Sequence, residues 1–203
     1  MRRTPWHTRR AAILHGSVVY DVRTMIDPAV GAMLTGAFAL LFVSAALDKL
    51  RSLQGFAEVF RAYRLLPDGV ARLSWLVPAL ELTVGVGLLA RRSRAGAGAA
   101  GAALLVAYAA AIAINLQRGH RDLACGCGGP HARRPIAAWM AWRNLLLAGL
   151  LATMLLPWIA RPMAAADAVT IGAGTAVAAL LYMSLDRLLA QVTPRTAPLR
   201  GSR

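Results

Sequence analysis

The chain has 203 residues, of which 58% are hydrophobic and only 16% are charged. This is too apolar for a water-soluble domain of that size, so we expect a membrane protein. The formal net charge is +14, but the arginines lie mainly in short segments between apolar runs, where they meet lipid headgroups. Nucleic-acid binding is excluded as the reason for the charge, because no soluble domain remains outside the apolar runs.

Five apolar runs have the length and composition of membrane-spanning helices, which need about 20 residues to cross a hydrocarbon core. They cover residues 28–47, 73–90, 95–116, 136–158 and 166–185. The sequence therefore predicts an all-α fold, a multi-pass transmembrane helical bundle with a four-helix core and a fifth helix. Membrane lipid is its expected surrounding.

The connector between the first two runs, residues 48–72, has an amphipathic pattern. Its apolar residues recur at helical spacing with charges between them: Leu50, Leu53, Phe56, Val59, Phe60 and Tyr63. We expect an interfacial helix that lies flat at the membrane surface between the first two spans. A connector with no further task would show the same pattern.

The chain divides into four regions. Residues 1–27 are a basic extension without the apolar core of a signal peptide, and translation from Met25 is an alternative hypothesis for the start of the chain. Residues 28–158 form the four-helix membrane domain and residues 159–190 carry the fifth helix. Residues 191–203 are rich in Pro and Arg, and we expect them to be disordered.

Both cysteines of the chain, Cys125 and Cys127, lie in one loop and are separated by one glycine. Glycines and a proline around them give the loop a permissive backbone. A disulfide between residues two apart closes a small, strained ring, and strained, exposed disulfides exchange readily. Neighbouring arginines, Arg118 among them, favour the nucleophilic thiolate. The pattern favours a catalytic or redox pair.

Two alternative roles for this loop stay open. His120, Cys125, Cys127 and His131 make a set of two thiols and two imidazoles that could bind a metal, although the CxC spacing is tighter than usual. The thiols could also be inert in a membrane scaffold. A redox role requires both thiols but neither histidine, a metal role requires all four residues, and a scaffold tolerates loss of either cysteine.

Polar residues inside the apolar runs gather in the half of the bundle nearest this loop. Glu81 and Arg143 lie at nearly the same depth, about 11 to 12 Å from the loop side. Because an ionisable group in a membrane should face protein or water, the sequence predicts an ion pair between them. Lys49 can reach towards Glu81 by snorkelling, and Asn115 and Asn144 add amides. Such a cluster either joins helices or lets Glu81 accept protons.

Four stretches of the chain resemble the MauE/DoxX family of redox-associated membrane proteins, most closely its MauE branch. They fall within residues 35–155 and read AALDKLRSLQGFAEVFRAYRLLP, VPALELTVGVGLL, AIAINLQRGHRDLACGCGG and WRNLLLAGLL. The most specific part is Asn115, Arg118 and Gly119 leading to CGC, followed by Arg143 and Asn144 in the next helix.

The resemblance implies a protein of the bacterial plasma membrane that assists maturation of an exported, disulfide-rich client together with a thioredoxin-like protein. In the MauE branch the client is the small subunit of methylamine dehydrogenase. Cys125 and Cys127 are then the reacting pair, supported by Lys49, Glu81, Asn115, Arg118, Arg143 and Asn144. No nucleotide loop, haem motif or hydrolytic constellation identifies a cofactor or a conventional enzyme. With two cysteines, electrons must pass to another protein or to a bound cofactor.

The orientation of the bundle decides which compartment the thiols face. Five spans place the CxC loop, the amphipathic connector and the C-terminal tail on one side. Basic residues are more numerous on that side, which favours the cytoplasm by the positive-inside rule. Disulfide chemistry favours the export compartment instead.

Overall fold

The computed structural model describes residues 26–65, 67, 69, 72–120, 123, 135–159 and 161–192. The elements are α1 (Pro28–Arg51), α2 (Leu53–Ala62), the 3-10 turn η2 (Arg72–Trp75), α4 (Leu76–Leu89), α5 (Arg94–Gln117), α6 (Ala138–Ala152), the 3-10 turn η3 (Thr153–Leu155) and α7 (Ala165–Val192). No strand occurs among these residues, and the predicted all-α bundle is confirmed. Cys125, Cys127 and His131, the alternative start Met25 and the two chain ends lie outside the described residues.

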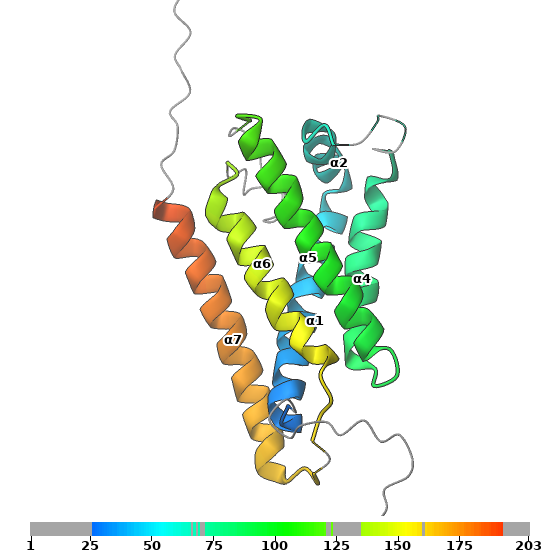
Figure 1. Cartoon of the computed structure of the whole chain (residues 1–203), viewed down its shortest axis with the longest axis vertical. Coiled ribbons are helices and arrows are strands. Elements are labelled where there is room, and N and C mark those ends of the chain that lie inside the picture. The colour runs from blue at the N-terminus through cyan, green and yellow to red at the C-terminus, as the bar shows by residue number, and fades with distance from the viewer. Residues whose placement is uncertain are drawn as a thin grey trace, which may run out of the picture.

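Of the helices in the described residues, five run along the bundle axis and alternate in direction, namely α1, α4, α5, α6 and α7, whereas α2 lies across one end (Figure 1). The most extensive packing is between α5 and α6 and between α1 and α4; α4 also packs on α5, and α7 on α1. We call the end that carries α2, the start of α6 and the last turn of α5 the loop end, because residues 118–137 connect helices there. The opposite end carries Asp27, the α4–α5 turn and residues 156–159 and 161–164.

Four helices are long and apolar enough to cross a membrane: α1, α5, α7 and the continuous segment Ala138–Leu155. The run predicted at residues 73–90 forms a shorter apolar helix, Leu73–Leu89. It begins as 3-10 turn η2 and continues as α4, so that both together rise about 29 Å. Pro78 fits this helix because it lies in the first turn of α4, where its missing N–H has no helical acceptor to lose.

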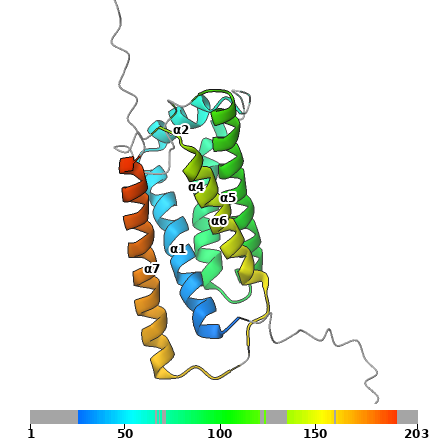
Figure 2. The same ribbon diagram turned by 60° about the vertical axis from the view of Figure 1, so that its left-hand side comes forward.

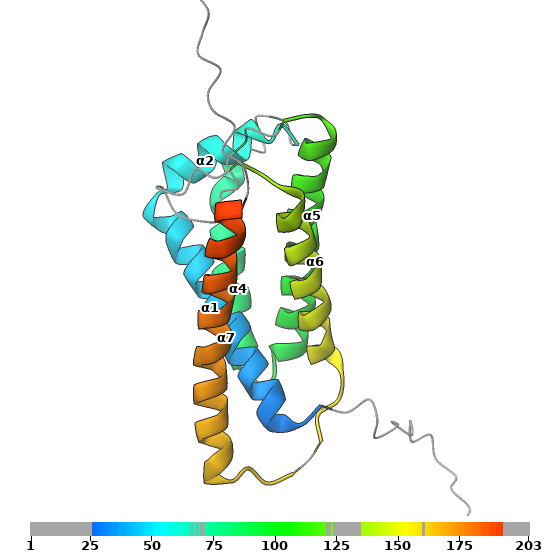
Figure 3. The same ribbon diagram turned by 90° about the vertical axis from the view of Figure 1, so that its left-hand side faces the viewer.

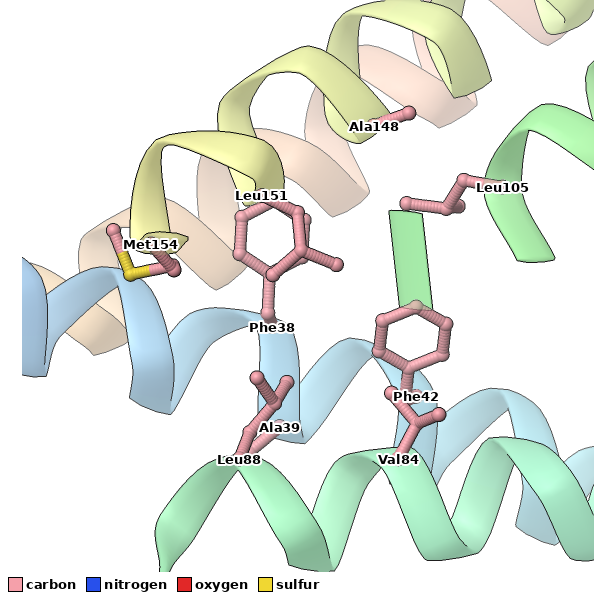
Figure 4. Packing of buried hydrophobic residues seen from close by; sticks show 9 residues of the cluster. All are labelled: Phe38, Ala39, Phe42, Val84, Leu88, Leu105, Ala148, Leu151 and Met154. Atoms are coloured by element: carbon pink, nitrogen blue, oxygen red, sulfur yellow. The ribbon is translucent and has the colours of Figure 1, made fainter. Parts of the chain in front are cut away.

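The apolar core of the bundle lies between α1, α4, α5 and α6 (Figure 4). It consists of Phe38, Ala39, Phe42, Val84, Leu88, Leu105, Ala148, Leu151 and Met154. Two glycines let the helices approach closely. A Cβ on Gly85 would lie 3.2 Å from the Ala39 carbonyl oxygen, and one on Gly101 would lie 2.8 Å from Leu151 Cδ2. Close packing at small residues is how helices associate in lipid, where burial from water adds little between helices.

The opposite end is closed by polar contacts. Asp27 caps α1 by accepting a 2.8 Å hydrogen bond from the Ala29 N–H, and Pro28 supplies the first helical residue. Arg161 donates to Asp27 and also to Asp167 in the first turn of α7. These hydrogen bonds from Arg161 hold the pKa of Asp27 below its ordinary value. One guanidinium therefore ties the start of α1 to the start of α7.

The amphipathic helix α2 covers the loop end of the bundle (Figure 3). Ser52 breaks the helix between α1 and α2 with φ −142° and ψ 62°. The rings of Phe56 and Phe60 lie 5.9 Å apart, and the Lys49 ammonium lies 5.6 Å from the Phe56 ring. Part of the apolar side of α2 thus faces the end of α1. Its location in a membrane interface stays a prediction.

The fifth long helix, α7, packs along α1 (Figure 2). The Thr175 hydroxyl donates a 3.2 Å hydrogen bond to the Met33 carbonyl, and Gly36 and Gly174 leave room for their partners on the facing helix. None of the α7 residues whose burial the structure describes is fully buried, so most of α7 presents side chains to the surroundings of the bundle.

Candidate functional site

A buried ion pair joins α1 to α4 near the loop end. The Lys49 ammonium lies 2.7 Å from Glu81 Oε1 and 2.9 Å from Oε2. The two side chains are 7% and 1% exposed. Removal of both charges from water is costly, and the short contact with both carboxylate oxygens offsets that cost. The predicted reach of Lys49 towards Glu81 is confirmed.

Tyr108 adds a third helix to this pair. Its hydroxyl donates a 2.7 Å hydrogen bond to Glu81 Oε1, and its ring lies 5.7 Å from the Lys49 ammonium. The sequence analysis did not identify Tyr108. A hydroxyl on a helix built mainly of Ala, Gly and Leu needs a polar partner inside the bundle, which was the available signal. The resulting cluster of Lys49, Glu81 and Tyr108 holds a carboxylate, an ammonium and a phenol in contact. Such groups can store and exchange charge inside an apolar bundle.

The predicted ion pair between Glu81 and Arg143 is wrong. Arg143 instead pairs with Asp186 of α7, and its guanidinium lies 5.3 Å from the Trp139 ring and 5.6 Å from the Tyr182 ring. Counting residues along the predicted helices placed Glu81 and Arg143 at similar depths, but depth does not tell which helices are neighbours. Glu81 lies on α4, which packs on α1 and α5, whereas Arg143 lies on α6, which packs mainly on α5. The carboxylate of Glu81 therefore pairs with Lys49 on the adjacent helix α1.

The two asparagines lie in the same half of the bundle, as predicted. Asn115 on α5 is 0% exposed and Asn144 on α6 is 3% exposed. Asn115 Nδ2 donates a 3.0 Å hydrogen bond to the Ala111 carbonyl. Within the described part of the chain, Asn115 Oδ1 and Asn144 Nδ2 have no hydrogen-bond partner.

The described flanks of the CxC loop are held at the loop end. Gly119 ends α5 with φ +79°, a conformation that glycine adopts without strain, and the His120 N–H bonds back to the Asn115 carbonyl at 3.0 Å. Leu123, two residues before Cys125 in the sequence, accepts a 3.0 Å hydrogen bond from the Ile136 N–H. The loop therefore departs from the end of the bundle that contains Lys49, Glu81 and Tyr108.

Of the remaining predicted site residues, the structure describes Arg118 and His120 but not Cys125, Cys127 or His131. Arg118 is exposed, and its guanidinium donates to the Arg64 carbonyl at 3.3 Å. Because Cys125, Cys127 and His131 lie outside the described residues, the thiol pair and the alternative metal set with His120 stay predictions. The described residues contain no group of three or more His, Cys, Asp or Glu that could hold a metal ion.

The chain is similar to known proteins over most of its length. A family model described as "Methylamine utilisation protein MauE" matches residues 27–158. Curated relatives named "Methylamine utilization protein MauE" include one from Paracoccus denitrificans, 38% identical over 185 residues, which cover 85% of this chain and 96% of the relative. Another, from Paracoccus versutus, is 39% identical over 180 residues, or 86% of this chain and 96% of the relative.

A relative with the same name from Methylorubrum extorquens is 36% identical over 160 residues, which cover 78% of this chain and 85% of the relative. No solved structure matches the chain significantly. The family model spans the first four membrane helices together with the Lys49, Glu81 and Tyr108 cluster and the CxC loop. On these matches, the chain belongs to the MauE family of helical membrane proteins.

Proposed function

We propose that this chain acts in methylamine utilisation, as a membrane protein that assists maturation of an exported, disulfide-rich protein by thiol–disulfide exchange. The observation that carries the pathway is the match to relatives named for methylamine utilisation, which extends over 96% of the two Paracoccus proteins. The client that fits this pathway is the small subunit of methylamine dehydrogenase. The exchange is assigned to Cys125 and Cys127 because they are the only cysteines.

The exchange proceeds through a mixed disulfide. A thiolate of a thioredoxin-like partner attacks one sulfur of the Cys125–Cys127 disulfide, which forms an intermolecular S–S bond and frees the other sulfur as a thiolate. The second thiol of the partner then displaces the chain from this bond. The partner leaves as a disulfide and the chain as a dithiol, so that two electrons and two protons have been transferred. The reverse steps oxidise the chain and reduce the partner.

The polar half of the bundle supports this assignment by its position and chemistry. The Lys49–Glu81 pair is buried in the half from which the CxC loop departs, and we assign it the task of balancing charge beneath the loop. Arg118, exposed at the flank of the loop, is suited to stabilise a thiolate. The apolar opposite half of the core contains no comparable buried pair among the described residues.

We assign the loop end to the export side of a bacterial plasma membrane, because disulfides persist in oxidising compartments. A membrane-impermeant thiol reagent, added to intact cells or to inverted vesicles before and after reduction, tests this orientation. Cysteine labelling from the outside only after reduction is the expected result. Labelling that requires access from the cytoplasmic side contradicts the orientation.

Growth complementation tests the proposed function. A Paracoccus denitrificans strain that lacks its own MauE relative is supplied with this chain and grown on methylamine. Wild type should restore growth, whereas Cys125→Ser and Cys127→Ser should not, and His120→Ala and His131→Ala should. Failure of all four variants would favour a metal site, and growth of both serine variants would favour a scaffold. Immunoblots of membranes establish that each variant is present in equal amount.

A further inference from the structure

Two buried amide atoms of complementary kind lie unpartnered at the α5–α6 interface. Asn115 Oδ1 can accept a hydrogen bond and Asn144 Nδ2 can donate one, yet neither has a partner within the described residues. Both side chains are at least nine-tenths buried. A buried polar group without a hydrogen bond destabilises a fold, and natural proteins satisfy such groups with protein or with ordered water.

The orientation of the Asn115 amide is fixed by its second contact. Nδ2 donates a 3.0 Å hydrogen bond to the Ala111 carbonyl one turn earlier. Exchange of the amide nitrogen and oxygen would place two acceptor oxygens against each other, so that a rotated amide is disfavoured. Oδ1 is therefore the atom that needs a donor from outside the helix.

The packing register places Asn144 relative to α5. The antiparallel helices α5 and α6 meet where Gly101 faces Leu151, and nearer the loop end Ile112 and Met140 share an apolar cluster. Asn144 follows Met140 by one turn on the same buried face of α6. Its level along α5 is therefore one turn below Ile112.

That level on α5 is the level of Tyr108. Asn115 lies seven residues beyond Tyr108, which is about 10 Å further towards the loop end. Buried hydrogen-bonding groups thus lie at two levels about 10 Å apart, with Asn115 nearer the loop end and Asn144 further in, level with Tyr108. The Tyr108 hydroxyl in turn contacts Glu81 at 2.7 Å.

We propose that the α5–α6 interface binds ordered water at Asn115 and Asn144. Water matches each atom separately, because one molecule can donate to the Asn115 carbonyl oxygen and another can accept from the Asn144 amide N–H, and buried water typically bonds to groups that the protein leaves unsatisfied. The binding of water does not depend on the proposed function.

Hydroxyl-radical footprinting by X-ray radiolysis tests the site, because radicals formed from a bound water oxidise the side chains beside it. Met140 is the reporter, since it is 4% exposed and lies one turn from Asn144. Met154 is a matched internal control that is 3% exposed in the apolar core. The structure predicts oxidation of Met140 severalfold faster than Met154, and Asn144→Leu should remove this difference. Asn144→Ala repeats the test without added volume.

The outcomes separate this site from the exchange chemistry. Equal slow oxidation of the two methionines in wild type would overturn the water site, as would a fast Met140 reaction that persists in both Asn144→Leu and Asn115→Leu. If Met154 is oxidised faster in Asn144→Leu than in wild type, the substitution has opened the bundle. The Met140 and Met154 rates of Asn144→Ala are then compared with those of wild type instead. A Cys125→Ser, Cys127→Ser double variant should keep the wild-type footprint even where it no longer supports growth on methylamine.

Discussion

The Lys49 ammonium lies within 2.9 Å of both carboxylate oxygens of Glu81, although the two residues are 32 positions apart. The pair is almost completely buried and joins the end of α1 to the first half of α4. The Tyr108 hydroxyl extends it to α5. Three of the membrane helices therefore meet at one polar cluster in the half of the bundle nearest the loop end.

A double-mutant cycle tests the energetic coupling of Lys49 and Glu81. Lys49→Met and Glu81→Gln each leave one charge buried without its partner, and we expect each to lower stability by about 3 to 5 kcal/mol. The double variant should be more stable than the sum of the two losses implies, because it contains no orphan charge. Unfolding in detergent, followed by loss of helical signal, gives the four free energies. Additive losses would mean that the two residues do not interact.

The contact between Arg143 and Asp186 should hold the loop-side half of α7 to α6. Asp186→Asn removes the negative charge, and we expect a loss on the order of 1 to 3 kcal/mol from the unpaired guanidinium. The exchanged pair Arg143→Asp with Asp186→Arg should recover part of that loss. Asp48→Asn is the control, because Asp48 forms an exposed pair with Arg51 and such pairs contribute little. A loss no larger than that of the control contradicts the assignment.

Close helix packing predicts opposite effects at two glycines. Gly101→Leu should destabilise the bundle by about 1 to 3 kcal/mol, because even a Cβ there would lie 2.8 Å from Leu151 and 2.9 Å from Val84. At Gly149, a Cβ has no neighbour within 4 Å. Gly149→Ala should therefore be neutral or stabilising by up to about 1 kcal/mol, through helix propensity alone. Thermal unfolding of both variants checks this prediction. A lower melting temperature for Gly101→Leu alone would show that close packing, and not the loss of a glycine as such, decides the effect.

The contact at the opposite end predicts a dependence of stability on pH. Arg161 holds the pKa of Asp27 below its ordinary value of 3.8 in the folded protein. A lowered folded pKa adds stability that is present above the unfolded pKa and is lost as pH falls through the folded pKa. Melting temperatures measured from pH 6 to pH 3 should therefore decline below about pH 4. Arg161→Gln should make this decline shallower; an identical decline in the variant would exclude the contact as its cause.

The sequence was sufficient to predict the helices, because in lipid each backbone group must bond within its own helix and each span must be apolar. The run at 95–116 corresponds to α5 at Arg94–Gln117, and the run at 166–185 lies within α7. The run at 73–90 corresponds to the segment Leu73–Leu89, whose first turn is 3-10. Burial of Glu81 was predicted correctly from the cost of a charge in lipid.

The partners within the site could not be predicted in the same way. Hydropathy gives the depth of a residue along its helix, but not which helices are neighbours or which faces meet. From the sequence, Arg143 and Lys49 were therefore equally suitable ion-pair partners for Glu81. The packing of α4 against α1 brings Lys49 to it. Asp186 was overlooked because it lies just beyond the apolar run of the fifth helix, where a charged residue at the membrane surface needs no partner.

The most direct test of the central claim is the capture of a mixed disulfide. Cys127→Ser leaves Cys125 without its resolving partner, and Cys125→Ser does the converse. In membranes of cells grown on methylamine, one of the two variants should accumulate a covalent adduct that reducing agent dissociates, with mass spectrometry placing the S–S bond on a cysteine of a thioredoxin-like protein. If both variants are abundant and neither forms such an adduct, while wild type supports growth on methylamine, the chain does not act by thiol–disulfide exchange.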